Sequence, residues 1–487
     1  MAKPQAILLY IVAVALMFTA CMDDENYSLS KSDLLTFSTD SIKLDTIFST
    51  VPSSTRSFWV YNKTSHGLRC KNIRLDNGNQ VGFRANVDGT YLSPASGYQV
   101  NDVEIRKGDS IRVFIELTST KNFGTTPQKI EDNLVFTLES GAQQKVNLNA
   151  YTWDADVVRG QKILADTTIS AATRPIVIYG GITVEKNTTL TIAPGSTLYF
   201  HDDGGINVYG RLLCKGTADK KIELRGDRLD NMFDYLPYNY VSGQWPGIHL
   251  YESSYDNTLE YIEIHSTYDG LKVDSSDVKK KKLTLRNSTI HNCQGYALYA
   301  VNSYIEATNV QLTNSLNACL GIVNGNVSLN NCTLAQCYPF DSNRGPALSV
   351  STTEKSPFLA FECKNSLITG FASDEMQIAY DKEQKDSCKF SFDHCIIRTP
   401  KIETEDSVFF KNVTFEDATD TTQTARKHFV KIDDNTYRYD FHLAKGSKAI
   451  NAADPNSAEK IDHNGTQRDE KPDIGAFEFV AEQEKKE

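Results

Sequence analysis

The stretch Leu285-Arg286-Asn287-Ser288-Thr289-Ile290 recurs along the second half of the chain and decides the fold. Its clearest further copies are Ala307-Thr308-Asn309-Val310-Gln311-Leu312 and Leu329-Asn330-Asn331-Cys332-Thr333-Leu334. An earlier copy centres on Tyr261 and weaker copies centre on Asn365, His394 and Asn412, so successive centres are 26, 22, 22, 34, 29 and 18 residues apart. Self-similarity at such a period is typical of solenoids, in which each repeat forms one coil.

The positions of the apolar residues within each copy indicate where the coil turns. Apolar or small residues lie two before, one after and three after each centre, so the alternation of a strand is interrupted at the centre. Asparagine tolerates the left-handed backbone of such a turn, and stacked coils about 4.8 Å apart would let it hydrogen-bond its counterpart. The pattern resembles the asparagine ladder of right-handed parallel β-helices, here Asn287, Asn309, Asn331, Asn365 and Asn412. The alternative is an antiparallel β array whose turns carry asparagine by coincidence.

Flanking segments strengthen this resemblance. Ile182–Glu185, Leu190–Phe200 and the turn Trp245-Pro246-Gly247-Ile248 are similar to bacterial β-helix proteins of the pectin-lyase-like superfamily. Asp462–Arg468 and Asp473–Glu478 resemble the C-terminal module called choice-of-anchor Q. We therefore expect an all-β chain with a right-handed parallel β-helix over 157–445. A solenoid has a raw end that needs a cap, so we expect a capping module over 446–480, before a charged tail, 481–487.

The region before the β-helix has a different pattern. Short alternating runs such as Ile111–Ile115 and Leu134–Leu138 are separated by turn signals such as Ser140-Gly141. This spacing predicts an immunoglobulin-like antiparallel β-sandwich over 33–153. Asp40–Phe48, with Asn86–Gly89, resembles the N-terminal module of Bacteroidetes surface lipoproteins.

The first residues indicate export. Lys3 precedes an apolar run, Ala6–Phe18, that is short for a membrane span, and small residues precede Cys21. Residues 1–20 resemble a bacterial lipoprotein signal peptide, which implies acylation of Cys21 (palmitate among the chains) and outer-membrane lipid as a partner. Asp23, Asp24 and Glu25, in an acidic tether over 21–32, resemble a surface-export signal. The alternatives are a plain signal peptide cut near Ala20 and a tether that is only a spacer.

Composition narrows the function. The chain has 487 residues and a formal charge of −11, and its one cationic run, Lys279–Lys282, is expected to be a solvated turn. An acidic chain lacks the positive charge that supplies most nucleic-acid affinity, so no nucleic-acid partner is expected. Apart from Cys21, nine cysteines occur without a Cys-x-x-Cys motif, and we interpret them as small buried hydrophobes.

No residues for catalysis emerge from the sequence. The superfamily includes lyases and glycoside hydrolases, but their motifs are missing here, so we name no catalytic residue and no cofactor. His265 and His291 follow equivalent positions of successive coils and should be neighbours. Their column continues as Thr313, Ala335, Thr369 and Arg398, without a third ligand, so we expect two exposed histidines and no metal site. Asp462, Asp469 and Asp473 fit a hydrogen-bonded turn with Arg468 better than a calcium site.

One insertion is rich in aromatic residues. Between Arg228 and Trp245 the candidate binding residues are Phe233, Tyr235, Tyr238, Tyr240 and Trp245. Such rings stack on sugars and anchor protein interfaces, or they fill a groove of their own protein. Longer coil spacings place further insertions around Tyr338–Lys355 and Phe371–Lys385, and such loops tend to form recognition surfaces.

Three functions stay open. The first is a non-catalytic surface lipoprotein that binds a glycan or an outer-membrane protein, or has a structural role. The second is a polysaccharide lyase or glycoside hydrolase, which carboxylates and a Lys or Arg converging in one groove would favour. The third is an accessory subunit of outer-membrane assembly or transport machinery.

Overall fold

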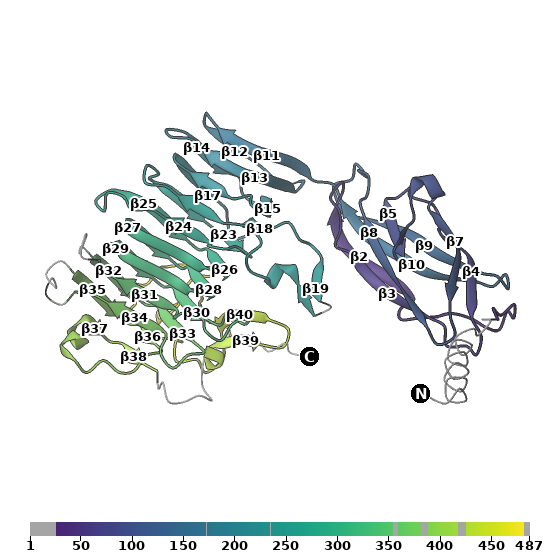
Figure 1. Cartoon of the computed structure of the whole chain (residues 1–487). Helices are drawn as coiled ribbons and strands as arrows, with labels where there is room; N and C mark the ends of the chain where they lie inside the picture. The colour runs from purple at the N-terminus through teal and green to yellow at the C-terminus, as the bar shows by residue number, and fades with distance from the viewer. Residues whose placement is uncertain are drawn as a thin grey trace, which may run out of the picture. The chain divides into compact units, whose positions relative to one another are not determined.

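The computed structural model describes residues 26–171, 173–233, 235–353, 359–381, 383, 388–416 and 425–481. The predicted signal peptide, Cys21 and the acidic residues Asp23, Asp24 and Glu25 lie outside these residues, as does the tail after 481. The chain divides into two units, 1–154 and 155–487 (Figure 1). Among the described residues, no helix has the length and apolar character to span a membrane.

The first unit is the predicted β-sandwich. One sheet has the order β1 (Thr36–Phe37), β3 (Arg56–Tyr61), β8 (Ser110–Leu117), β5 (Phe83–Val87) and β6 (Thr90–Tyr91). The other has the order β2 (Ser41–Phe48), β10 (Gln143–Trp153), β9 (Gln128–Leu138), β4 (Leu68–Leu75) and β7 (Gln99–Ile105), and the short helix η1 spans Pro94–Ser96. All pairs are antiparallel except β2 with β10. Alternate residues of β8 and β9, such as Val113 and Phe136, point into one shared core, as the alternating sequence predicts.

The second unit is a parallel β-helix, in which 26 strands stack (Figure 1). Their parallel pairings define three faces. The first face contains β11 (Asp156–Ile163), β13 (Ile176–Val184), β15 (Thr197–His201), β18 (Ile222–Gly226), β23 (Ile262–His265), β26 (Thr289–Cys293), β28 (Gln311–Ser315), β30 (Thr333–Gln336), β33 (Leu367–Gly370), β36 (Ile396–Ile397) and β38 (Thr414–Phe415).

The other two faces complete each coil. The second face continues from β11 and β13 through β16 (Ile206–Val208), β21 (Ile248–Leu250), β24 (Leu271–Val273), β27 (Tyr296–Thr308), β29 (Ala318–Asn330), β31 (Leu348–Ser351) and β34 (Met376–Ala379). The third contains β12 (Thr167–Ile169), β14 (Thr189–Ile192), β17 (Arg211–Lys215), β22 (Asn257–Glu260), β25 (Lys281–Arg286), the later parts of β27 and β29, β32 (Leu359–Lys364), β35 (Cys388–Asp393) and β37 (Phe410–Lys411).

The predicted coil register is confirmed. Ile264, Ile290, Leu312, Leu334 and Ile368 pair in succession on the first face, and all are buried in the core. The centres of the repeat, Tyr261 and His394 included, adopt left-handed backbone with φ between 47° and 52°. The alternative of an antiparallel array is therefore wrong.

The ladder itself differs from the expectation in its partners. Asn309 Nδ2 donates to Asn287 Oδ1 at 3.0 Å, as an asparagine ladder requires. Asn331 and Asn365 instead donate to Asp473 O and to Asn330 Oδ1, and the exposed Asn412 donates to Asp393 Oδ1. A second pair, Asn314 to Asn292 at 3.3 Å, closes the other end of the first face and was not predicted.

The C-terminal segment lies along this ladder. Ile461 O accepts from Asn309, and the backbone N–H groups of Glu459 and Asp454 donate to Asn331 and Asn365. These contacts place the module on the flank of the helix, whereas we expected it to cap the raw end. The physical reason is that the turn amides offer hydrogen-bonding groups that irregular backbone can satisfy.

The parallel coils end before the predicted residue 445. The last coil strand is β38, and after the short helices η4 (Glu405–Phe409) and η5 (Ala425–Lys427) the chain forms an antiparallel hairpin, β39 (Phe429–Asp433) and β40 (Arg438–Leu443). Phe429, Phe441 and Leu443 share a small core with Ile474 and Phe477 of the C-terminal module. The nine cysteines among the described residues are free and buried, as predicted.

Candidate ligand site beneath the C-terminal hairpin

The aromatic insertion connects β18 of the first face to β21 of the second. It contains a small hairpin, β19 (Asn231–Phe233) and β20 (Leu236–Pro237), and the short helix η2 (Tyr238–Tyr240). Trp245 is 1% exposed, stacks on Phe200 at 4.0 Å between ring centroids and donates from Nε1 to His265 O. The prediction that Trp245 belongs to a binding surface is therefore wrong, because its ring completes the core of the coil.

The four other predicted residues of this insertion have different surroundings. Phe233 and Tyr235 are 53% and 52% exposed and stack on each other. The guanidinium group of Arg228 lies 3.9 Å from the ring centre of Tyr238. The hydroxyl group of Tyr240 accepts a hydrogen bond from Arg438 of β40 at 3.0 Å. The insertion thus combines an exposed aromatic pair with two tyrosines that contact arginine side chains.

Tyr240 also lines a cavity of about 360 Å³ between the first face and the hairpin β39–β40, which we call the hairpin cavity. No local sequence pattern predicts this cavity, because its walls come from four separate parts of the chain: the coils, the insertion, the hairpin and the C-terminal module. Figure 1 shows the hairpin beside the ends of the first-face strands. The lining residues are Lys221, Tyr240, Glu263, Thr289, His291, Asn292, Gln311, Asn314, Tyr439, Asp440, Phe441, His442, His463, Asn464 and Phe477.

Charged side chains in the hairpin cavity are engaged by neighbouring groups. Lys221 Nζ donates to Asn464 Oδ1 at 3.1 Å, and Asn464 Nδ2 donates to His442 Nε2 at 2.7 Å. His442 Nδ1 then donates to Asp440 Oδ1 at 2.6 Å, which completes a chain of four side chains. His463 is buried between Thr289 Oγ1 and Asn309 O, and burial lowers its pKa to about 4.

Two polar groups that line the hairpin cavity have unused hydrogen-bonding capacity. Asn314 is 2% exposed, and within the described part of the chain its Oδ1 atom has no hydrogen-bond partner. The hydroxyl group of Tyr439 likewise has none there. Buried polar atoms are nearly always satisfied in folded proteins, so such atoms at a cavity wall suit a bound polar molecule.

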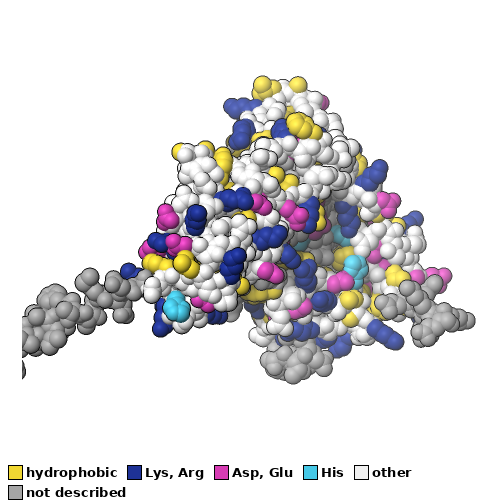
Figure 2. Space-filling model, turned by 90° about the vertical axis from the view of Figure 1, so that its right-hand side faces the viewer, with side chains coloured by type: hydrophobic (Ala, Val, Ile, Leu, Met, Phe, Trp, Pro, Cys, Tyr) yellow, Lys and Arg dark blue, Asp and Glu magenta, His cyan; other side chains and the backbone are white. Residues whose placement is uncertain are grey.

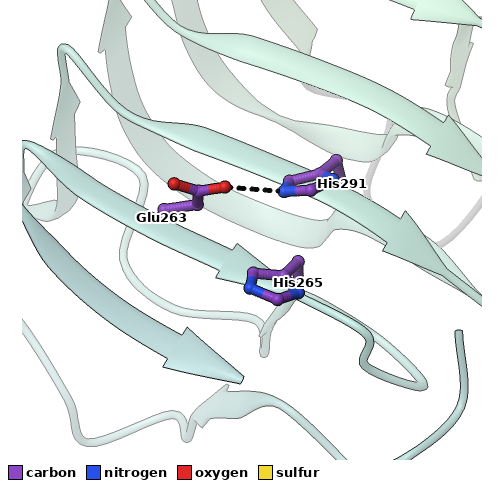
Figure 3. Close-up of side chains that lie close together, drawn as sticks. All are labelled: Glu263, His265 and His291. Carbon is purple, nitrogen blue, oxygen red and sulfur yellow. Dashed lines mark hydrogen bonds and ion pairs between the residues drawn. The ribbon is translucent and has the colours of Figure 1, made fainter. Parts of the chain in front are cut away.

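One edge of the hairpin cavity carries paired histidines and carboxylates. His265 and His291 are opposite each other in β23 and β26, with ring centroids 5.0 Å apart, so the predicted neighbourhood is confirmed. The expected exposure is wrong for His265, which is 2% exposed. Glu263, two residues before His265, provides a third potential metal ligand beside the two histidines. Figure 3 shows the three side chains close together. Glu263 lies opposite Thr289, one column away from the two histidines, so the column of His265 and His291 in the sequence does not contain it.

Each histidine of this cluster meets a carboxylate. Glu263 Oε1 lies 3.0 Å from His291 Nε2, and Glu223 Oε1 of β18 lies 3.2 Å from His265 Nε2. Burial alone would raise the pKa of both glutamates, but hydrogen bonds and charge from the histidines lower it below its usual value. Burial lowers the pKa of His265. Both carboxylates are thus held ionised.

Each aspartate near the C-terminus has a structural partner. Asp462 and Asp473 accept backbone N–H groups, including those of Thr466 and Asn451. Arg468, expected to pair with these aspartates, instead forms an ion pair with Glu478 at 3.0 Å.

Comparison with known proteins identifies the fold of the second unit. Residues 235–370 match the family described as "Right handed beta helix region", which confirms the handedness of the β-helix. No curated protein matches the chain.

Similarities to solved structures are weak. They include the VesB protease of Vibrio cholerae (12% identity, 25% of this chain and 32% of that chain, TM-score 0.17) and the ASH/PapD-like domain of human CEP192 (10% identity, 28% and 94%, TM-score 0.18). The catalytic unit of a GH87 alpha-1,3-glucanase from Streptomyces thermodiastaticus has 11% identity over 75% and 91%, with a TM-score of 0.25. This chain therefore spans about a third of the VesB chain. TM-scores at this level carry no argument about function.

Proposed function

We propose that this protein is a non-catalytic surface lipoprotein that binds a glycan in the hairpin cavity. The observation that carries this proposal is the pairing of an aromatic ring with unsatisfied polar groups. The half-buried ring of Tyr240 lines one cavity together with Asn314 and Tyr439, whose side-chain oxygen atoms lack partners among the described residues. Phe441 and Phe477 also line it, but both are buried in the small core described above. Sugar rings present apolar faces that stack on aromatic rings and hydroxyl groups that hydrogen-bond to amides.

The state of the charged groups favours binding over catalysis. The hydrogen bond with His291 lowers the pKa of Glu263 and holds it ionised, so this carboxylate is a poor proton donor to a leaving group. Lys221 and Asp440 are tied into the hydrogen-bonded chain through Asn464 and His442. Groups arranged in this way can orient a ligand. Glycoside hydrolysis instead needs one carboxylic acid that can donate a proton and a second carboxylate that is free to act as base or nucleophile.

The proposal includes the location of the protein. Acylation of Cys21 would anchor the chain in the outer membrane, and Asp23, Asp24 and Glu25 would direct it to the cell exterior, where glycans are available. Figure 2 shows acidic and basic side chains interspersed over the face it draws. The formal charge of −11 disfavours nucleic acid.

A glycan array with the full-length, detergent-solubilised protein tests the proposal. Tyr240→Ala should weaken binding of the glycans found by about tenfold or more, because truncated interface aromatics cost ~2 kcal/mol. Tyr240→Phe should retain most binding, because it keeps the ring. The matched control is Tyr299→Ala, which removes a half-buried tyrosine from β27, away from the hairpin cavity. Equal binding by Tyr240→Ala and the control would reject the hairpin cavity as the glycan site.

A polysaccharide lyase or glycoside hydrolase is the second candidate. Lys221, Glu263 and Asp440 line the same cavity, which is the convergence of carboxylates and a basic group that this function requires. Incubation of the protein with each glycan found on the array, followed by chain-length analysis, distinguishes the two candidates. Shortened chains that depend on Asp440, tested with Asp440→Asn, would replace the binding proposal with an enzymatic one.

A protein partner is the third candidate, as a structural role or as an accessory subunit of outer-membrane machinery. The observation that favours it is the exposed aromatic pair Phe233 and Tyr235. A further exposed ring is Phe340, which is 39% exposed and whose ring centroid lies 5.1 Å from that of Tyr437. Exposed aromatic groups of this kind anchor interfaces. Affinity purification from solubilised membranes should recover an outer-membrane protein with the native chain and lose it with Phe233→Ser and Tyr235→Ser combined.

A further inference from the structure

We propose that Glu263, His265 and His291 form a binding site for a divalent first-row transition metal ion, best represented by Zn²⁺. The three side chains each offer one ligand atom, and these atoms lie within 4.8 Å of one another (Figure 3). Inward shifts of about an ångström would bring them to the mutual separation expected around one zinc ion. Glu263 and His291 also line the hairpin cavity, but metal binding at this site requires no glycan.

The β-helix itself brings the ligands together. Glu263 and His265 share the outer face of β23, on either side of the core residue Ile264, and His291 occupies the position opposite His265 on β26. Stacked coils repeat at about 4.8 Å, so side chains of one row stand side by side without any special loop. Rigid strands therefore present two imidazoles and a carboxylate in a fixed relation.

Hydrogen bonds around His265 orient its metal-binding nitrogen. Ser266 Oγ donates to Asn239 O at 3.1 Å, so the same oxygen accepts the Nδ1–H of His265 at 2.9 Å. His265 Nε2 lies 3.2 Å from Glu223 Oε1 and is the ring nitrogen that can bind a metal ion, which would take the place of the contact with Glu223. A fixed hydrogen-bond partner at Nδ1 is the usual second contact of a metal-bound histidine.

The surroundings define the metal. Two imidazole nitrogens with carboxylate oxygen suit zinc, copper or nickel, whereas calcium and magnesium prefer oxygen alone. Glu223 adds negative charge, although Arg225 lies 3.7 Å from it and offsets part of that charge. Glu263 and His291 line the hairpin cavity, and the Glu263 side chain is 40% exposed, so an ion has a path from solvent.

Zinc binding to the chelator-treated full-length protein, measured by isothermal titration calorimetry without glycan, tests the site. We expect one Zn²⁺ per chain and at least about 100-fold weaker binding by His291→Gln, since even outer-shell changes cost ~10–100-fold. The matched control is His249→Gln. His249 Nε2 pairs with Asp274 at 2.8 Å on another face, in the same kind of histidine–carboxylate pair, and this variant should bind like the native chain.

Two further measurements keep the proposal falsifiable if His291→Gln folds poorly. Co²⁺ added to the native protein should produce the visible absorption of a nitrogen- and oxygen-ligated ion, and Zn²⁺ should abolish it. Glu263→Gln, nearly isosteric at a partly exposed side chain, should also weaken Zn²⁺ binding. No binding by the native chain, or equal binding by all variants, would overturn the site. A glycan array repeated in the presence of a metal chelator shows whether glycan binding depends on the metal. Failure of the metal site and failure of the proposed glycan binding can therefore be told apart.

Discussion

Arg468 Nη2 donates a hydrogen bond to Asn309 Oδ1 at 3.2 Å, although the two residues are 159 positions apart. Asn309 also donates to Asn287 in the neighbouring coil and to Ile461 O in the C-terminal module. One amide therefore joins two coils and the module, and all of its hydrogen-bonding groups are used. This junction couples the stability of the module to that of the coils.

Asn309→Ala should destabilise the protein more than any other ladder change. It removes the partner of Asn287 Oδ1 and of Ile461 O and one of the hydrogen bonds of Arg468, which keeps Glu478. Each buried group left unsatisfied costs about 1–3 kcal/mol. The control is Asn412→Ala at an equivalent backbone angle, φ 52° against 51°, where the side chain is exposed. Thermal melts should show the larger loss for Asn309, and equal losses would mean that backbone strain, not the junction, sets the cost.

His463 should make stability depend on pH. Its pKa is lowered to about 4 from 6.5, so its contribution is complete above about pH 6.5 and is lost as pH falls toward 4. The full effect is at most about 3 kcal/mol. In melts, the difference in stability between the native chain and His463→Asn should be constant above this window, shift against the native chain as the pH falls through it, and be constant again below it. Asp473, whose pKa is raised to about 6 by burial, acts in the opposite direction but is common to both chains.

Trp245 and Tyr235 should separate packing from recognition within one insertion. Trp245→Ala removes a buried ring stacked on Phe200 and should cost about 3–5 kcal/mol. Tyr235→Ala removes a side chain of a residue that is 52% exposed and should change the melting temperature little. Denaturant unfolding of both variants checks this, and a large loss for Tyr235 would show that the exposed pair is a packed lid.

Cys21→Ala should release the protein from membranes. Acyl chains on Cys21 are the anchor we propose, and each buried CH₂ group contributes about 0.8 kcal/mol. Fractionation of cells at high salt measures the effect. Retention of the variant in the membrane fraction would contradict the lipoprotein assignment.

Replacement of Asp23, Asp24 and Glu25 by alanine should keep the protein in the membrane but remove it from the cell surface. Protease treatment of intact cells measures surface exposure, and lysed cells serve as the control for cleavage. Unchanged cleavage on intact cells would mean that these residues are only a spacer.

The sequence alone determined the coils. The asparagines with left-handed backbone and the interrupted alternation around Asn287, Asn309 and Asn331 are local features of the sequence. In a stack of parallel coils, the spacing between such features sets which residues of neighbouring coils lie opposite each other. For the same reason the neighbourhood of His265 and His291 could be predicted. The alternating runs before residue 153 likewise indicated the sandwich, because a half-buried strand has a period of two.

Only the tertiary structure decided what covers the coils. Trp245 and Tyr235 were both candidate binding residues of one insertion, yet Trp245 is buried and Tyr235 is exposed. Lys282 in the basic run is buried, with its Nζ donating to Tyr251 O. The hairpin cavity and the Asn309–Arg468 contact join segments more than 150 residues apart. These contacts form where backbone outside the coils hydrogen-bonds to the polar groups at the turns of the coils. The repeat pattern in the sequence does not say which distant segment will do so.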